Sequence, residues 1–399
     1  MPPRFLWRQT ISGSSGACSS FFPFIVSAKA PWVHPRVQQP MARTSPIPES
    51  HAGSWVLIAG VVLACLLASA GLGFRFTGLL LPGLSLLLLA AAAVIGRSTA
   101  RPRLYAGASA FLLMTLFSEL GILLSYALAA KAGPLWDGAL AHADRRLGFD
   151  WPAVFLASDH SPVLLWIGAV AYHSLPLQMI VCIVALSGTA RFRTLGITIS
   201  AAILSGFATI LLSGLMPAMG NVFDPARFSH LWPSVAWMER GMIAGLRDGS
   251  WRTLDLTQLW GIVTFPSYHA TLPIILAWGQ RDIPRLRILA PLWAGLTILA
   301  TPLFGGHYGV DVLVGMGLAP LALAITSSPA WHRLGELALP SVSGKPAPAT
   351  STALGWTALP PRAHRRHDPA TSRTESVRLV PHPADEPSYP TRKRANGGE

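Results

Sequence analysis

The sequence predicts an all-α, polytopic membrane protein with about eight transmembrane helices, and three observations carry this prediction. Of its 399 residues, 51% are apolar and only 12% are charged, whereas about a quarter are charged in soluble proteins. Several apolar runs reach the roughly 20 residues that a spanning helix needs. Lys and Arg are unevenly divided between alternate loops. This composition excludes a secreted soluble enzyme, a disordered regulator and a nucleic-acid-binding domain.

The eight predicted spans are continuous apolar runs with few charges. Five contain no charged side chain, the third holds Glu119, the seventh has Arg287 at its edge and the last holds Asp311. The fourth carries His173 and Gln178. The spans are residues 55–74, 78–96, 104–130, 162–190, 194–219, 262–279, 286–306 and 309–327.

The loops between these spans predict the orientation. Eight spans place both termini on one side, and 23 of the 31 Lys and Arg residues fall on that side against 8 on the other. Short loops rich in Lys and Arg remain on the cytoplasmic side of a membrane. The net charge of +13 therefore indicates orientation in a plasma membrane rather than an acidic partner, and both termini are expected to be cytoplasmic.

The two ends of the chain differ from the apolar middle. Residues 1–53 form a leader without a long apolar run, in which Met41 is a second candidate start. Residues 54–103 supply two helices outside a six-helix core at 104–327. From residue 328 to 399 the chain is basic, rich in Pro and without periodicity, which predicts a disordered cytoplasmic tail. Nothing in the sequence specifies an oligomeric state.

The loop between the third and fourth spans alternates Trp and Leu with charged residues from Trp136 to Trp151. This spacing suits a helix that lies in the membrane interface. An ordinary polar loop with a short helix fits the pattern equally well.

Two segments combine chemically useful side chains at the start of an apolar helix. The first contains Pro266, Ser267 and His269, and the second contains Gly306, His307 and Asp311. Free N–H groups at a helix start attract phosphate, and glycine lets the backbone approach a ligand closely. His307 and Asp311 lie four residues apart and hence on one helical face, where the carboxylate can orient the imidazole.

The span count places both histidines on the same side of the membrane. The sixth and eighth spans each begin on the non-cytoplasmic side, so that His269 and His307 should meet there. An odd number of spans between them would separate them by the thickness of the bilayer, about 30 Å.

This set of residues predicts phosphoryl transfer through a covalent intermediate. A neutral His307 imidazole oriented by Asp311 can attack phosphorus, and a protonated His269 can donate a proton to the leaving alkoxide. Arg240 and Arg247, with six residues between them in the outer loop, are candidates to bind the nonbridging oxygens. No carboxylate cluster suited to Mg²⁺ is visible, so neither a metal nor another cofactor is expected.

These motifs resemble signatures of the type 2 phosphatidic acid phosphatase superfamily. Residues 266–269 (Pro-Ser-Tyr-His) resemble its second signature and residues 306–311 (Gly-His-Tyr-Gly-Val-Asp) its third. Within the superfamily the chain is similar to the branch that contains inositol phosphorylceramide synthases, on the context of residues 144–151, 217–220 and 246–249. The resemblance covers about residues 104–327. It implies a six-helix core with an extracytoplasmic site.

The resemblance also implies roles for individual residues. His307 would be the nucleophile, Asp311 its partner, His269 the general acid, and Ser267 a phosphate ligand. Two departures concern the phosphate site. The first signature is matched only in a degenerate form, by Arg240 and residues 247–248, and the third has Ala300 and Thr301 where the family usually has Ser-Arg.

The expected function is that of a membrane-embedded phosphatase or phosphotransferase acting on a lipid phosphate or a phospholipid head group. Water as acceptor gives a phosphatase, whereas a second lipid's hydroxyl gives a head-group transferase like inositol phosphorylceramide synthase. An alternative of another class is a transporter or lipid-binding protein, for which Glu119, His173 and Gln178 would form a polar pathway.

Overall fold

The computed structural model describes residues 51–131, 133–331 and 333, which form α-helices, a short 3₁₀-helix and one two-stranded sheet. The leader up to residue 50, with Met41, and the tail from residue 334 lie outside the described residues. The elements are α1 (Ala52–Leu72), β1 (Arg75–Thr77), α2 (Leu80–Ser98), α3 (Pro102–Lys131), α4 (Asp137–Arg146), α5 (Trp151–Asp159), α6 (Pro162–His173), α7 (Leu175–Gly188), α8 (Phe192–Leu215), η1 (Pro225–Arg227), α9 (Val235–Asp248), β2 (Thr253–Asp255), α10 (Tyr268–Gln280), α11 (Leu286–Gly305) and α12 (Gly309–Ser327).

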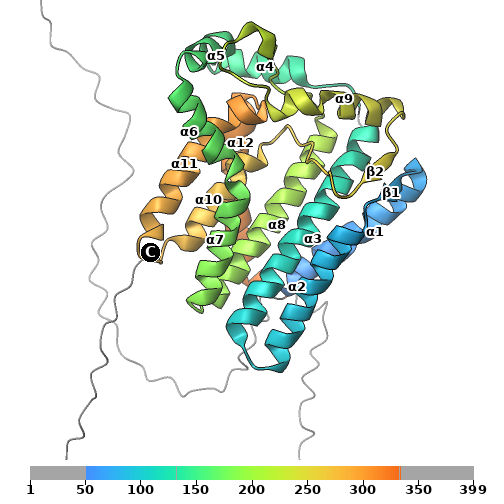
Figure 1. Ribbon diagram of the computed structural model, residues 1–399, viewed down its shortest axis with the longest axis vertical. Coiled ribbons are helices and arrows are strands. Elements are labelled where there is room, and N and C mark those ends of the chain that lie inside the picture. Colours follow the sequence, from blue (N-terminus) through green and yellow to red (C-terminus); the bar gives the residue numbers. More distant parts are fainter. Residues whose placement is uncertain (1–50, 132, 332, 334–399) are drawn as a thin grey trace, which may run out of the picture. The chain divides into compact units, whose positions relative to one another are not determined.

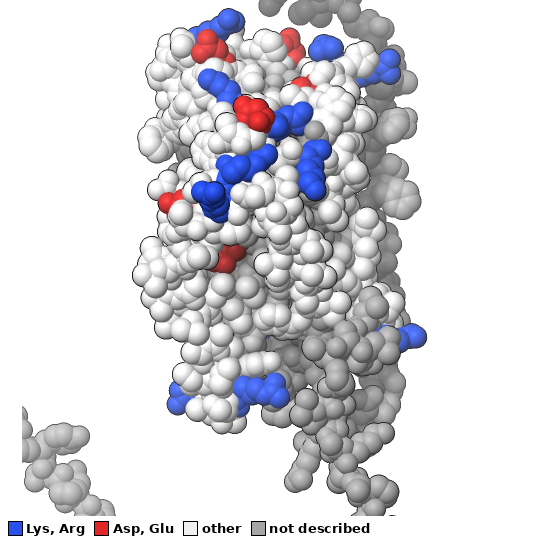
Figure 2. All heavy atoms as spheres, turned by 90° about the vertical axis from the view of Figure 1, so that its right-hand side faces the viewer, with Lys and Arg blue, Asp and Glu red and all other residues white. Residues whose placement is uncertain are grey.

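The prediction of an all-α membrane protein is confirmed. Six helices in the described part are long and apolar enough to cross a membrane, namely α1, α2, α3, α8, α11 and α12. They run side by side with α6, α7 and α10, while α4, α5 and α9 lie across one end of the bundle (Figure 1). Figure 2 shows charged side chains over the upper half of the visible face and at its lower end, with an uncharged band between them, as expected for a surface that faces lipid.

The predicted fourth span, residues 162–190, is divided in the structure. It forms α6 and α7, which meet at Ser174. Pro176 stands in the first turn of α7, where its missing N–H costs no helical hydrogen bond, but a proline cannot continue the ladder of the preceding helix. Helix α6 is also joined to α5 through a bend of 109°. The predicted span is therefore present as two helices that meet at one residue.

The predicted sixth span, residues 262–279, begins later than expected. Its helix, α10, starts at Tyr268 and has 13 residues. The described part therefore has six long apolar helices, or seven spans if the bent pair α5 and α6 is counted as one. The Ser267 N–H donates to the Asp311 carbonyl at 3.0 Å. The start of α10 therefore lies beside the first turn of α12, and residues before it reach into the bundle without helical structure.

A short parallel sheet joins two connections that are far apart in the sequence. Strand β1 follows α1, and β2 follows α9, with Arg75 opposite Thr253. Both strands lie at the end of the bundle that α9 covers (Figure 1). Helices α1 and α2 pack mainly against α3, while α8 occupies the centre and is the most buried of the long apolar helices.

The close approach of α10 and α12 depends on Gly315. A Cβ atom at this position would collide with the backbone carbonyl of Ser267. We expect Gly315→Ala to lower the midpoint of thermal unfolding in detergent clearly, because backbone atoms must move to make room. Gly317→Ala on the same helix meets open space and should leave the midpoint unchanged or slightly higher. Equal midpoints for the two variants would contradict this packing.

Candidate functional site

The loop between α11 and α12 carries His307. Helix α11 ends at Gly305, and Gly306 adopts the left-handed conformation with φ 75°, which a glycine adopts without steric cost. A Cβ atom at Gly306 would lie 2.6 Å from the Ala236 Cβ on α9. Helix α9 therefore packs directly on the loop at Gly306.

His307 and Asp311 form the pair that their spacing predicts. The His307 Nδ1 lies 3.5 Å from Asp311 Oδ2, and the two side chains are 6% and 0% exposed. The same Oδ2 accepts a hydrogen bond from the Tyr308 N–H at 2.9 Å, which fixes the carboxylate at the start of α12. Because Nδ1 faces Asp311, Nε2 is the nitrogen left for chemistry.

His269 reaches the same place from α10. Its ring stacks on Tyr172 of α6 with centroids 4.3 Å apart and an interplanar angle of 14°. A Cβ atom built on Gly305 would lie 3.3 Å from His307 Nε2 and 3.0 Å from the Tyr172 hydroxyl oxygen. The structure thus brings both histidines against the same small volume, as the topology predicts. Nothing in the sequence pattern distinguishes Tyr172 from other aromatic residues of the spans.

Several buried polar atoms around this loop have no hydrogen-bond partner among the described residues. They include Ser267 Oγ, Asp311 Oδ1 and Asn221 Nδ2. Ser267 is fully buried at the start of α10, and the Asn221 N–H donates to the Gly306 carbonyl at 2.7 Å. Buried polar groups are nearly always satisfied in native proteins. These unmet groups are ones that a bound polar ligand could satisfy, and Asn221 adds a donor to them.

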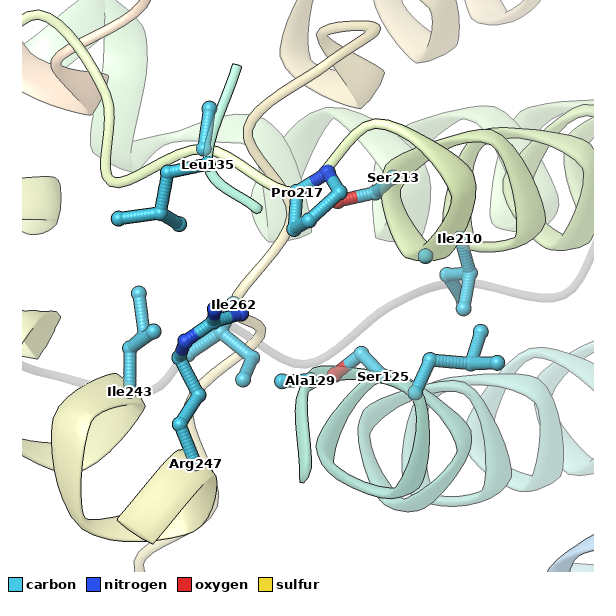
Figure 3. A pocket seen from close by; sticks show the side chains of 12 residues that line it. Ser125, Ala129, Leu135, Ile210, Ser213, Pro217, Ile243, Arg247 and Ile262 are labelled. Atoms are coloured by element: carbon cyan, nitrogen blue, oxygen red, sulfur yellow. The ribbon is translucent and has the colours of Figure 1, made fainter. Parts of the chain in front are cut away.

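The two arginines predicted to bind phosphate lie in other surroundings. The Arg247 Nη2 donates to the Gly133 carbonyl at 2.8 Å, and the side chain borders a cavity of about 20 Å³ between α3, α8 and α9 (Figure 3). The exposed Arg240 stacks on Trp237, with its guanidinium carbon 3.2 Å from the ring centroid. Among the described residues, no hydrogen bond or ion pair joins either arginine to His269 or His307.

Helix α4, rather than a basic residue, holds the start of α12. The Asp144 carboxylate is fully buried and accepts from the N–H groups of Gly309 at 2.7 Å and Val310 at 2.8 Å. It also accepts from the indole Nε1 of Trp151 at 2.6 Å. A carboxylate at this position satisfies free helix N–H groups and interacts favourably with the helix dipole.

A second carboxylate of the same helix fixes the neighbouring loop. Asp137 accepts hydrogen bonds from the N–H groups of Met219 and Gly220, each at 3.0 Å, and from the Tyr308 hydroxyl at 3.1 Å. The segment predicted as either an interfacial helix or a polar loop is thus two helices, α4 and α5, and the two acids of α4 bind the residues that follow His307. The alternation of charged and apolar residues indicates a helix in this segment. No sequence pattern predicts the contacts that Asp137 and Asp144 make with distant loops.

Uncharged residues stand at the two positions where the third signature usually has Ser-Arg. Ala300 and Thr301 are both buried on α11, and the Thr301 hydroxyl donates to the Thr297 carbonyl at 2.8 Å. Neither brings a positive charge to the loop. Among the described residues, no group of three or more His, Cys, Asp or Glu side chains is arranged to hold a metal ion.

The residues of the alternative polar pathway are dispersed. The Gln178 amide donates to the hydroxyl of Thr297 at 2.9 Å and to that of Ser174 at 3.2 Å. His173 is exposed on the outside of α6, and Glu119 is partly exposed on α3. No hydrogen bond links these three side chains to one another in the part of the chain that the structure describes.

Comparison with family models gives a match over the region that contains this site. Residues 138–325 match the family model described as the PAP2 superfamily. The match covers just under half of the chain, extends from α4 to α12 and includes His269, His307 and Asp311. No curated protein and no solved structure matches the chain significantly.

Proposed function

We propose that this chain is a PAP2-type membrane enzyme that transfers or hydrolyses a phosphoryl group on a lipid through a phosphohistidine at His307. The observation that carries the proposal is the buried His307–Asp311 pair, with Nδ1 and Oδ2 3.5 Å apart, facing the side where His269 stacks on Tyr172. The match of this region to the PAP2 superfamily supports a phosphatase or phosphotransferase.

The geometry assigns a role to each catalytic residue. The His307 Nε2 attacks phosphorus while Asp311 stabilises the imidazolium that forms on the other nitrogen. The bond between phosphorus and the lipid oxygen breaks, and protonated His269 donates its proton to that oxygen. An acceptor then attacks the phosphohistidine and gives its proton to His269, the N–P bond breaks, and His307 leaves as the neutral imidazole.

The phosphate oxygens need donors in the same volume. Ser267 Oγ and Asn221 Nδ2 are unpartnered donors whose backbones bond to Asp311 and Gly306, and Gly306 lets the backbone come close. Binding by Arg247 and Arg240 stays a prediction from the sequence. It requires the arginine side chains to move from their present contacts with Gly133 and Trp237 when an anionic head group arrives.

The acceptor decides the reaction class. Water gives a lipid phosphatase, and an alcohol gives a transferase, of which an inositol phosphorylceramide synthase-like activity is the specific form that the sequence resembles. We propose no cofactor. The division of Lys and Arg between the loops supports a plasma-membrane protein with cytoplasmic termini and an extracytoplasmic site.

Product analysis tests the proposal. Purified protein receives phosphatidate or a phospholipid labelled in the phosphate, with and without a lipid alcohol such as ceramide or diacylglycerol, and the products are separated by chromatography. Label transferred to the added alcohol indicates a transferase, and label released as inorganic phosphate under all conditions indicates a phosphatase. Recovery of unchanged lipid with every substrate would contradict both forms of the proposal.

A further inference from the structure

Helix α9 buries one acidic side chain in an otherwise apolar stripe. Its buried positions include Ala236, Glu239, Ile243 and Leu246, which are spaced to lie on one helical face. Glu239 is only 8% exposed, and its Oε1 has no hydrogen-bond partner in the described part of the chain. An unsatisfied buried acceptor costs about 1–3 kcal/mol. The carboxyl group therefore destabilises the fold unless a ligand satisfies it.

Glu239 borders a pocket of about 350 Å³ between α9, the end of α3 and the segment around β2. Aromatic surfaces and polar groups alternate around its wall, which is the mixture typical of a small-molecule site. The residues that matter for binding are Tyr126, Glu239, Trp251, Asp255, Gln258 and Trp260.

The polar groups of this pocket suit uncharged hydroxyl groups. The Tyr126 oxygen accepts from the Trp260 N–H at 3.0 Å, which leaves its own hydrogen free to donate. Burial raises the pKa of Glu239 to about 8, so at pH 7 this group is mostly protonated and can both donate and accept. Trp251 and Trp260 are exposed at the wall, where their faces can cover the C–H surface of a ring or chain.

The pocket adjoins the phosphoryl-transfer site. Ala236 packs against Gly306, and Glu239 lies one turn further along α9, a rise of about 5 Å. Glu239 is close enough to act electrostatically on the phenols of both Tyr172 and Tyr126. Glu239 therefore lies near the ring that stacks on His269 and also lines the pocket.

We infer that this pocket binds a neutral, hydroxyl-rich group through Glu239, and that this group is the alcohol part of a substrate of the His307 reaction. The pocket and the unsatisfied Glu239 carboxyl group support the binding of such a group. Its part in the His307 reaction rests on the proposed function. The inference adds no covalent step. The same hydroxyl chemistry occurs in a free acceptor and in the head group of a lipid donor, and the experiment separates the two.

Protection of an engineered thiol measures binding without turnover. Thr253 lines the pocket and is exposed, so Thr253→Cys, with Cys18→Ser, provides a maleimide target in the full chain. Glycerol and methyl glucoside are the probes, with choline as the cationic comparison. When a polyol occupies the pocket in two thirds of the protein molecules, we expect maleimide labelling of Thr253→Cys to slow about threefold. Thr99→Cys, exposed at the end of α2 and outside the pocket, should be unaffected.

Two substitutions assign the effect to Glu239. Glu239→Leu should abolish protection while the protein remains folded, because it replaces an unsatisfied carboxyl with an apolar group on a buried face. Glu239→Gln should retain part of the protection. Protection by choline alone, or no protection by either polyol, would overturn the inference, as would full protection in Glu239→Leu.

Turnover with polyol present separates the inference from the proposed function. A phosphorylated polyol identifies the pocket as an acceptor site, and slower lipid turnover without that product identifies it as the place of a donor head group. Unchanged turnover despite protection would overturn the link to catalysis. If His307-dependent turnover occurs without protection, the pocket inference alone fails. If protection occurs without any turnover, the proposed function alone fails.

Discussion

Replacing His307 with alanine should reduce lipid-phosphate turnover by a factor on the order of 10⁴ or more, because the residue that forms the covalent bond is lost. The variant should still insert into the membrane and purify with a nearly unchanged thermal midpoint. Its side chain has an ion pair only with Asp311, at 3.5 Å, and its Nδ1 has no hydrogen bond among the described residues. The measurement is turnover of labelled lipid in detergent or vesicles.

A matched variant separates loss of chemistry from loss of structure. His160→Ala changes an exposed histidine at the end of α5 whose ring nitrogen contacts only the Leu156 carbonyl of its own helix. It should keep full turnover. Full turnover by His307→Ala would show that His307 is not the nucleophile. Absence of turnover in the unsubstituted protein would instead favour a transporter or lipid-binding protein.

Replacing Asp144 with alanine should damage both stability and turnover. The change leaves two N–H groups at the start of α12 and the Trp151 indole N–H without their acceptor. At about 1–3 kcal/mol for each unmet group, the loss is about 3 kcal/mol or more. Because the same contacts hold the segment that carries His307, turnover at a temperature where the variant is folded should also fall by about 10²-fold.

Asp150→Ala provides the control for Asp144→Ala. Asp150 accepts from the Ala153 N–H at the start of α5, so its removal should cost about 1 kcal/mol and leave turnover intact. A thiol-reactive dye that reports exposure of the buried Cys65 and Cys182 follows unfolding of all three proteins. Equal turnover in the Asp144 and Asp150 variants would show that α4 does not position His307.

The part of the fold that could be predicted from the sequence is the part that continuous apolar runs determine. Helices α1, α2, α3, α8, α11 and α12 each contain such a run, because a spanning helix must bury its backbone polar groups in its own hydrogen bonds. Two other apolar runs, residues 162–190 and 262–279, do not form single long helices in the structure. The Ser174 junction and the late start of α10 at Tyr268 depend on local proline chemistry and on packing against α12.

The candidate site was predictable where its residues are close in sequence or share a membrane side. The spacing of four between His307 and Asp311 predicts their contact, and the number of crossings predicts that His269 joins them. Contacts between distant loops were not predictable. Asp144 reaches Val310 across 166 positions, and Glu239 looks like an ordinary polar residue of an amphipathic helix until its burial is known.

Direct trapping of the intermediate tests the central claim. Protein mixed with phosphate-labelled lipid is quenched in alkali within one turnover, digested and examined by mass spectrometry for a phosphorylated peptide. We predict an alkali-stable, acid-labile phosphoryl group on His307, absent in His307→Ala and longer-lived when the acceptor is withheld. Turnover without any phosphorylated residue, or with the phosphoryl group on a residue other than His307, would contradict the mechanism.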